Sequence, residues 1–228
     1  MDILTKIDHT ILKPGATKAE VKQICDEAKQ YGFTVVVVNP CWIPFCKKEL
    51  AGKDIAIVTT LGFPLGQNLS KTKAAECADV IDAGADEIDM VINVGKLISG
   101  ENDYAYNDIK GVADCCHSRG KICKVILETC LLTEEQIVRA CELSEKAGAD
   151  YVKTSTGFSS GGATVEIVKL MRKTCGPRVK IKAAGGIRNL AQAKAMVEAG
   201  ADRLGTSAGL AIAAELSAGL AAKLAGEN

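Results

Sequence analysis

The stretch AGADYVKTSTG, residues 147–157, carries the signals that decide the fold. Its first four letters recur as AGAD at 83–86 and at 199–202. In each copy an amphipathic helical pattern ends at the glycine, which can take the left-handed conformation that terminates helices. A short apolar run follows the aspartate. Each copy therefore marks a junction where a helix ends and a strand begins.

Outward from these junctions, short apolar runs alternate with amphipathic helices, which is typical of an α/β protein. The copies are 64 and 52 residues apart, so each interval holds one or two strand–helix units. Capping boxes at Thr17-x-x-Glu20 and Thr133-x-x-Gln136 predict where two of the helices begin. Strands are expected at 7–9, 34–39, 55–60, 86–92, 122–128, 150–155, 179–184 and 202–206.

Eight strands with helices between them predict a single (β/α)8 TIM barrel, a length of 228 residues being suited to one such domain. We expect this domain to span residues 1–228 and to begin with a short N-terminal helix. The alternative is an open, doubly wound sheet. It is less favoured because no G-x-G-x-x-G motif follows the first strand.

The charge balance argues against nucleic acid as a partner. Lys+Arg and Asp+Glu both count 28, whereas attraction of nucleic acid needs a basic excess. A phosphorylated small molecule needs only a few local donors. The N-terminal segment does not resemble a signal peptide, and VVVV at 35–38 is too short to cross a membrane. The sequence predicts a cytoplasmic protein without a membrane partner.

The ten cysteines form no C-x-x-C pair and are expected to be reduced, mostly buried thiols. A catalytic cysteine is the alternative. Only two histidines, His9 and His117, are available to activate one, and neither has neighbours typical of a triad or a metal site. We therefore expect no metal and no other cofactor.

Lys153 is the strongest candidate for a catalytic residue. In a barrel, side chains alternate between the interior and the helices, and sites form at the carboxyl ends of the strands. Tyr151, Lys153 and Ser155 share one strand face, which must point into the barrel because helices cover the outside. A lysine held among apolar and cationic groups has a lowered pKa and is partly neutral, hence nucleophilic, near neutral pH.

Lys180 and Lys182 share a face of the segment VKIKAAGGIR, and Lys182 is nearer to its carboxyl end. A second ammonium group in the same cavity would lower the pKa of Lys153, so we assign this role to Lys182. Lys180, one layer deeper, could pair with an inward acid such as Glu87 or Glu128.

Asp89 lies between apolar residues in EIDMVIN, 87–93, where a carboxylate is costly unless it is paired or functional. It could be an ion-pair partner of the lysines, a carrier of protons to and from a substrate, or both.

Glycines follow several strands at the same end. Gly185 and Gly186 come after the seventh strand, and Gly205 and Ser207 come at the eighth, where barrels commonly bind phosphate through backbone N–H groups. Gly157 follows the Lys153 strand. Arg188 could add a donor or could form a surface ion pair. Glycines also simply make turns, but two sets at the expected places favour a phosphate site.

Taken together, these segments resemble the deoxyribose-phosphate aldolase family along essentially the whole chain. The resemblance is carried by IDHTILKP (7–14), VNP (38–40), TTLGFPLG (59–66), ADEIDMVINVG (85–95), VILET (125–129), YVKTSTGF (151–158), KAAGGIR (182–188) and RLGTSAG (203–209).

This resemblance implies a metal-free class I aldolase that cleaves 2-deoxy-D-ribose 5-phosphate to acetaldehyde and D-glyceraldehyde 3-phosphate. It implies that Lys153 forms the Schiff base, Lys182 tunes it, and Asp89 handles protons. It also implies a role in deoxyribonucleoside catabolism and a homo-oligomer, either a dimer or a tetramer. The implied phosphate-binding residues are Gly157, Gly185, Gly186, Gly205 and Ser207.

Two positions depart from some relatives: Phe158 stands where a lysine can occur, and Ala208 where a second serine can occur.

Two other functions stay open at this point. One is a different Schiff-base aldolase or a transaldolase acting on another phosphorylated sugar. The other is a phosphate-binding barrel without chemistry, since a fold alone does not imply an activity.

Overall fold

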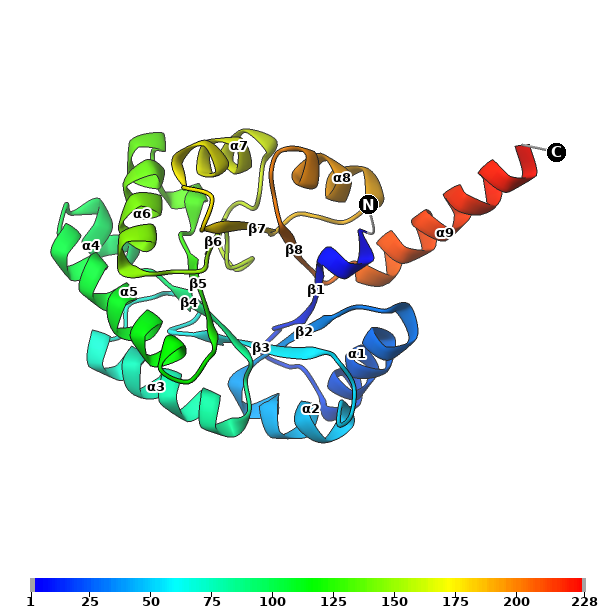
Figure 1. Cartoon of the computed structure of the whole chain (residues 1–228), viewed down its shortest axis with the longest axis horizontal. Helices are drawn as coiled ribbons and strands as arrows, with labels where there is room; N and C mark the ends of the chain where they lie inside the picture. The colour runs from blue at the N-terminus through cyan, green and yellow to red at the C-terminus, as the bar shows by residue number, and fades with distance from the viewer. Residues whose placement is uncertain (1–2, 227–228) are drawn as a thin grey trace.

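The computed structural model describes residues 3–226, with side chains described through residue 219. Within this range, eight parallel strands close into a barrel in sequence order, and helices surround it (Figure 1). The predicted barrel is therefore confirmed. The strands are β1 (Ile7–Ile11), β2 (Val35–Val38), β3 (Ala56–Leu61), β4 (Glu87–Val91), β5 (Ile122–Ile126), β6 (Tyr151–Lys153), β7 (Lys180–Ala184) and β8 (Arg203–Thr206).

Each of the eight predicted strands is present, with ends that differ by at most a few residues. The short N-terminal helix is a 3-10 turn, Leu4–Lys6. Further 3-10 turns are Pro40–Trp42 and Thr129–Leu131. The helices are α1 (Lys18–Tyr31), α2 (Ile43–Glu49), α3 (Ser70–Ala83), α4 (Val94–Ile98), α5 (Asn102–His117), α6 (Glu134–Ala147), α7 (Val165–Thr174), α8 (Leu190–Glu198) and α9 (Gly209–Gly226). The last of them, α9, extends away from the barrel (Figure 1).

The helix starts and ends follow the local signals in the sequence. Both predicted capping boxes form, Thr17 with Glu20 at α1 and Thr133 with Gln136 at α6. The glycines of the AGAD junctions take left-handed φ values where α3, α6 and α8 give way to strands. These values are +113° at Gly84, +99° at Gly148 and +112° at Gly200.

The aspartate of each AGAD junction has a further role that the sequence pattern did not indicate. Its carboxylate accepts a hydrogen bond from a backbone N–H of the preceding strand, so it fixes two neighbouring strands at their amino ends. The pairs are Asp86 with Ile57 at 3.0 Å, Asp150 with Cys123 at 2.8 Å and Asp202 with Ile181 at 2.8 Å.

Alternation along the strands divides the buried side chains into two sets. The outward residues, such as Ile88, Val152 and Leu204, pack with the helices in one large core. Inside the barrel, Leu12, Val35, Val37 and Val58 form a small apolar cluster beside β2 and β3. Barrel interiors are normally filled by branched apolar residues, so the charged remainder of this one marks a site.

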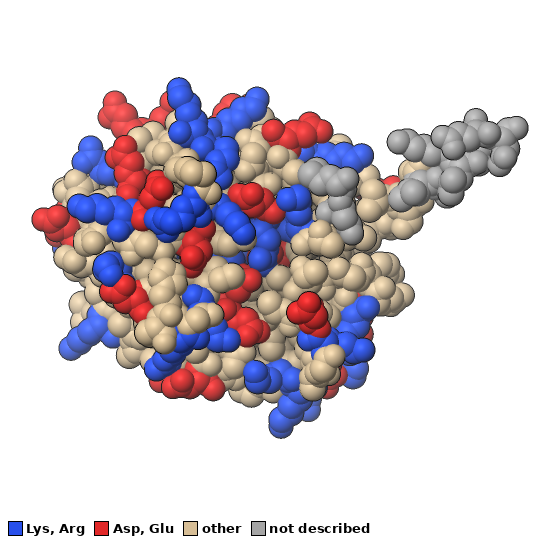
Figure 2. Space-filling view, in the orientation of Figure 1, with Lys and Arg blue, Asp and Glu red and all other residues tan. Residues whose placement is uncertain are grey.

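On the face that Figure 2 shows, acidic and basic side chains are interspersed. Among the described residues, no helix is both long and apolar enough to cross a membrane. The cysteines are free thiols: seven are buried, Cys115 is half-buried, and Cys41 and Cys130 are exposed. The expectation that most of the thiols are buried is thus confirmed.

Candidate active site

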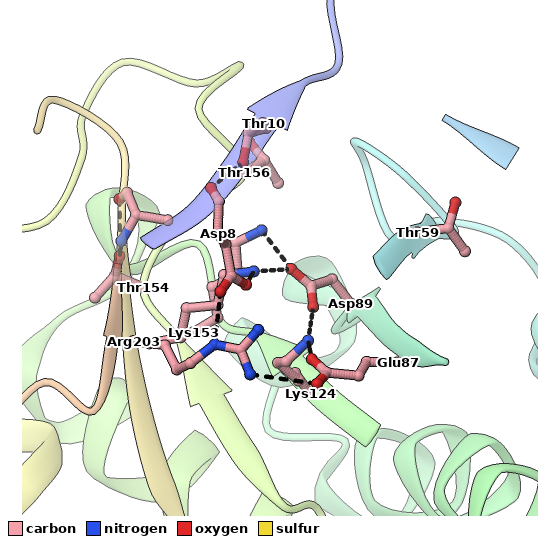
Figure 3. Close-up of polar contacts among 12 residues, drawn as sticks. Asp8, Thr10, Thr59, Glu87, Asp89, Lys124, Lys153, Thr154, Thr156 and Arg203 are labelled. Carbon is pink, nitrogen blue, oxygen red and sulfur yellow. Dashed lines mark hydrogen bonds and ion pairs between the residues drawn. The ribbon is translucent and has the colours of Figure 1, made fainter. Parts of the chain in front are cut away.

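A cluster of buried charges fills the barrel interior from β4 round to β1 (Figure 3). Its members come from inward positions of six strands, where the alternation of the strands places every second side chain. The carboxylates are Asp8, Glu87 and Asp89, and the cations are Lys124, Lys153, Lys182 and Arg203.

Asp89 lies at the centre of this cluster and is completely buried. Its Oδ2 atom accepts from Lys153 Nζ at 2.8 Å and from Lys182 Nζ at 2.7 Å. Its Oδ1 atom accepts from Lys124 Nζ at 2.8 Å. Burial by itself would raise the pKa of Asp89, but the three ammonium groups outweigh it and hold that pKa well below the usual range. The carboxylate is therefore ionised.

A second set of ion pairs surrounds the first. Asp8 contacts Lys182 at 2.5 Å and Arg203 at 2.6 Å. Glu87 contacts Lys124 at 2.6 Å and Arg203 at 3.2 Å. Lys124 and Lys182 thus each contact two carboxylates, whereas the ion pair of Lys153 is with Asp89.

The pKa values of Lys153 and Lys124 are shifted in opposite directions. Burial lowers the pKa of Lys153 to about 8; Asp89 opposes the shift, and Lys182 and Lys124 add to it. For Lys124 the effect of burial is outweighed by Asp89, Glu87 and Asp8, so its pKa is raised. Lys153 is consequently readily deprotonated near neutral pH.

Lys153 also borders a cavity of about 440 Å³ at the carboxyl ends of β1, β6, β7 and β8. The volume is in the range of small-molecule sites. All five predicted phosphate-binding residues line this cavity: Gly157, Gly185, Gly186, Gly205 and Ser207. Arg188 lines it as well, so its side chain is available to the cavity.

Hydrogen bonds made by threonine hydroxyls hold the loops that form the cavity wall. Thr154 Oγ1 donates to the Ala184 carbonyl at 2.9 Å and accepts from the Ala184 N–H at 3.0 Å, which ties the β6 loop to β7. Thr206 Oγ1 donates to the Ile187 carbonyl at 2.6 Å and accepts from the Ala208 N–H at 2.9 Å. The backbone N–H groups around the cavity are therefore held in a fixed arrangement.

The predicted placement of the catalytic candidates agrees with the structure, with one exception. Lys153, Lys182 and Asp89 meet inside the barrel. The pairing suggested for Lys180 is wrong, because Lys180 begins β7 at its solvent-facing end and is exposed. Glu87 pairs instead with Lys124 and Arg203, and the Glu128 carboxylate accepts from Thr156.

Sequence reasoning missed Asp8, Lys124 and Arg203. The signal was present, since each is a charge in a strand that helices cover. It was not applied to these three residues, although Lys124 lies in the middle of β5 just as Asp89 does in β4 and Lys182 in β7. Asp8 and Arg203 lie early in β1 and β8.

The histidines take no part in this cluster. His9 points outward from β1 and its Nε2 atom lies 2.7 Å from the Glu27 carboxylate. His117 is near the surface, 2.9 Å from Asp150. Within the described part of the chain, no three histidine, cysteine, aspartate or glutamate side chains are grouped as metal ligands.

The arrangement has the parts of an amine nucleophile site. A partly neutral lysine borders a cavity, an ionised carboxylate and a second ammonium group lie beside it, and glycine-rich loops line the same cavity. Such a site can form a Schiff base with a carbonyl compound and can move protons around it.

Comparison with known proteins identifies the family of the chain. The family model of the DeoC/LacD family aldolases matches residues 3–215. A deoxyribose-phosphate aldolase of Enterococcus faecalis is 54% identical over 93% of this chain and 96% of that protein. One of Thermococcus gammatolerans is 53% identical over 93% of this chain and 95% of that protein. The solved tetrameric deoxyribose phosphate aldolase of Aeropyrum pernix matches with a TM-score of 0.88 and 32% identity, over 94% of this chain and 91% of that one.

Proposed function

The chain belongs to the DeoC/LacD family of aldolases, and we propose that it reversibly cleaves 2-deoxy-D-ribose 5-phosphate to D-glyceraldehyde 3-phosphate and acetaldehyde. We propose that the reaction passes through a Schiff base on Lys153. The observation that carries this proposal is the position of Lys153, whose pKa burial lowers to about 8, between Asp89 and the cavity.

The proposed reaction begins when the neutral amine of Lys153 attacks the aldehyde carbon of the open-chain sugar. Loss of water gives an iminium ion, which accepts an electron pair. Removal of the C3 hydroxyl proton then breaks the C2–C3 bond, and the electrons of that bond form an enamine on the enzyme. D-glyceraldehyde 3-phosphate leaves. Protonation of the enamine at C2 and hydrolysis of the resulting iminium release acetaldehyde and restore the lysine.

Asp89 and Lys182 are the proposed proton carriers for these steps. Beside Lys153, Lys182 Nζ donates a hydrogen bond to Asp89 Oδ2 at 2.7 Å. A proton taken up by one of these two groups can therefore be returned through the other or through a water. Lys182 also contributes to the low pKa of Lys153 through its charge.

The phosphate is proposed to lie against the glycine-rich wall of the cavity. Gly157, Gly185 and Gly186 have left-handed φ values of +86°, +85° and +79°, which bring their backbone close to a ligand without a side chain in the way. Gly205 and Ser207 complete this wall, and Arg188 adds a cation. No metal is required by the proposed chemistry, because the iminium ion itself accepts the electrons of the broken bond.

The test is product analysis with purified protein. With 2-deoxy-D-ribose 5-phosphate, we expect equal amounts of D-glyceraldehyde 3-phosphate and acetaldehyde, at a rate that EDTA leaves unchanged. In the reverse direction, acetaldehyde should act as donor and ketoses should not. Transfer from a ketose would instead favour a transaldolase or a different Schiff-base aldolase.

The wider setting of the reaction is proposed from the resemblance. We propose a cytoplasmic enzyme of deoxyribonucleoside catabolism and a homo-oligomer, either a dimer or a tetramer; the related Aeropyrum pernix aldolase is tetrameric. Light scattering after size-exclusion chromatography tests the oligomer, and a mass of one chain would contradict it.

A further inference from the structure

Glu128 has a backbone conformation that its residue type disfavours. It lies two residues after the end of β5, with φ at +56° and ψ at +58°. Among the described residues it is the only one other than glycine with a positive φ. Its Cβ atom crowds the backbone in this conformation, whereas glycine takes it without strain. Strain of this kind persists only where the surrounding structure holds it, and it is concentrated at functional sites.

The Glu128 side chain is buried, 4% exposed, and is directed at a single residue. Its Oε1 atom accepts from the backbone N–H of Thr156 at 3.1 Å, and its Oε2 atom accepts from the Thr156 hydroxyl. Within the described residues, Glu128 belongs to none of the ion pairs of the barrel. A buried carboxylate without a cation depends on these two donors.

These contacts determine what Thr156 can offer to a ligand. Its hydroxyl proton is committed to Glu128, and its oxygen accepts from the Phe158 N–H at 3.0 Å. A hydroxyl oxygen accepts two hydrogen bonds, so one site remains. Thr156 lines the cavity beside Lys153 and Gly157. Thr156 can therefore accept a hydrogen bond from a ligand but cannot donate one.

We propose that Glu128 is a positioning residue for the hydroxyl-bearing part of the substrate. It holds the loop after β6 so that Thr156 presents a fixed acceptor to a hydroxyl group of the sugar phosphate and Gly157 faces the phosphate. This inference rests on the proposed function. It accounts for a glutamate where the backbone favours glycine, because glycine would keep the turn and lose the hold on Thr156.

The test compares Glu128→Gly and Glu128→Gln with wild type and with Glu135→Gln, a matched change on an exposed face of α6. Glycine fits the backbone but lacks the carboxylate. Glutamine keeps the size but offers one acceptor to two donors. We expect KM for the sugar phosphate to rise about tenfold in Glu128→Gly and less in Glu128→Gln, with kcat changed much less. Glu135→Gln should match wild type.

A second readout separates positioning from a general loss of structure. Acetaldehyde carries neither hydroxyl nor phosphate, so it does not use Thr156. Its capture on Lys153 by borohydride should be the same in wild type and both Glu128 variants, whereas capture of the sugar phosphate at low concentration should fall. Circular dichroism checks that each variant is folded.

Two outcomes would overturn the inference while leaving the proposed function intact. One is an unchanged KM in Glu128→Gly. The other is an equal loss of acetaldehyde capture and sugar phosphate capture in a folded variant, which would assign Glu128 to the Lys153 environment. Failure of wild type to capture either compound would instead contradict the proposed function.

Discussion

Charge balance inside the barrel decides which lysine beside Asp89 gives up its proton. Three carboxylates face four cations in the cluster, so the loss of one proton makes it neutral. Lys153 is the least compensated of the cations and borders the cavity. Deprotonation there relieves repulsion from Lys182 and Lys124 and leaves the remaining pairs intact.

The pH dependence of Schiff-base formation follows from this. The pKa of Lys153 is lowered from 10.5 to about 8, so its neutral fraction rises as pH passes through 8. The rate of acetaldehyde capture by borohydride on Lys153 should increase about tenfold per unit below that pH and level off above it. In Lys182→Met, which lacks a cation that lowers this pKa, the inflection should move to higher pH. A wild-type rate that keeps rising to pH 10 would contradict this assignment.

Removing the central carboxylate should affect stability and titration together. In Asp89→Asn, three buried ammonium groups lose their shared partner, and breaking buried pairs of this kind costs roughly 3–5 kcal/mol. Urea unfolding measures the loss. Because Asp89 opposes the lowering of the Lys153 pKa, its removal should move the inflection of the capture rate below pH 8. Wild-type stability in Asp89→Asn would rule out the central role of this carboxylate.

At the scale of single residues, the sequence was informative where a charge stood in a strand that helices cover. Lys153 and Lys182 were identified as charges toward the carboxyl ends of their strands and Asp89 as a carboxylate between apolar residues, and the three do meet. Which charged side chains pair across neighbouring strands could not be predicted, because the pairing depends on the register of the barrel. Lys124 faces Asp89 since the two are register partners on β4 and β5, and no local pattern reveals that. The conformation of Glu128 was not predicted, because nothing in VILET indicates a left-handed φ.

At the scale of elements, close packing of β8 against β7 positions Lys182. Gly205 lies beside Ala184, and a Cβ atom added there would be 2.9 Å from the Ala184 Cβ and 3.2 Å from the Lys182 Cε. The strand can approach this closely only with glycine. Gly205 is therefore required by the packing of Lys182 as well as by the proposed phosphate wall.

A pair of glycine substitutions tests this packing. Gly205→Ala should displace Lys182 or β8, lowering activity and costing about 1–3 kcal/mol of stability. Gly111→Ala lies on an exposed part of α5 with open space around it, so it should stabilise by about 1 kcal/mol and leave activity unchanged. Thermal melts and initial rates measure both. Full activity in Gly205→Ala would show that the strands can adjust.

The order of the elements was predictable because the junctions are local. Capping boxes, left-handed glycines and apolar runs each act within a few residues, and all eight strands were found from them. The ends of the strands were less certain. The sequence pattern of β6 continues to Ser155, but the strand ends at Lys153. The hydroxyl of the next residue, Thr154, bonds to the backbone of Ala184. Tertiary hydrogen bonds, which the sequence does not display, set such boundaries.

At the scale of the whole molecule, the thiols report how tightly the helices pack around the barrel. Cys25 lies 3.8 Å from Cys46 between α1 and α2, and Cys77 lies 3.6 Å from Cys116 between α3 and α5. These are contacts between free thiols within the core. Reagents reach them only when the helical layer opens.

Thiol titration of the native protein should therefore be strongly biphasic. Cys41 and Cys130 are exposed and should react with Ellman's reagent at once, and Cys115 more slowly. The buried seven should react on the timescale of unfolding, and all ten should react in denaturant. Rapid reaction of most thiols under native conditions would mean that the outer layer is loosely packed.

The central claim, a Schiff base on Lys153, is tested most directly by trapping and mapping the adduct. The protein is incubated with 2-deoxy-D-ribose 5-phosphate, reduced with borohydride, digested, and analysed by peptide mass spectrometry, beside Lys153→Ala and Lys182→Ala. We predict a reduced adduct on Lys153 that is absent from Lys153→Ala. An adduct on Lys182 would reverse the roles of the two lysines. No adduct in the folded wild-type protein, together with cleavage that EDTA abolishes, would contradict the account.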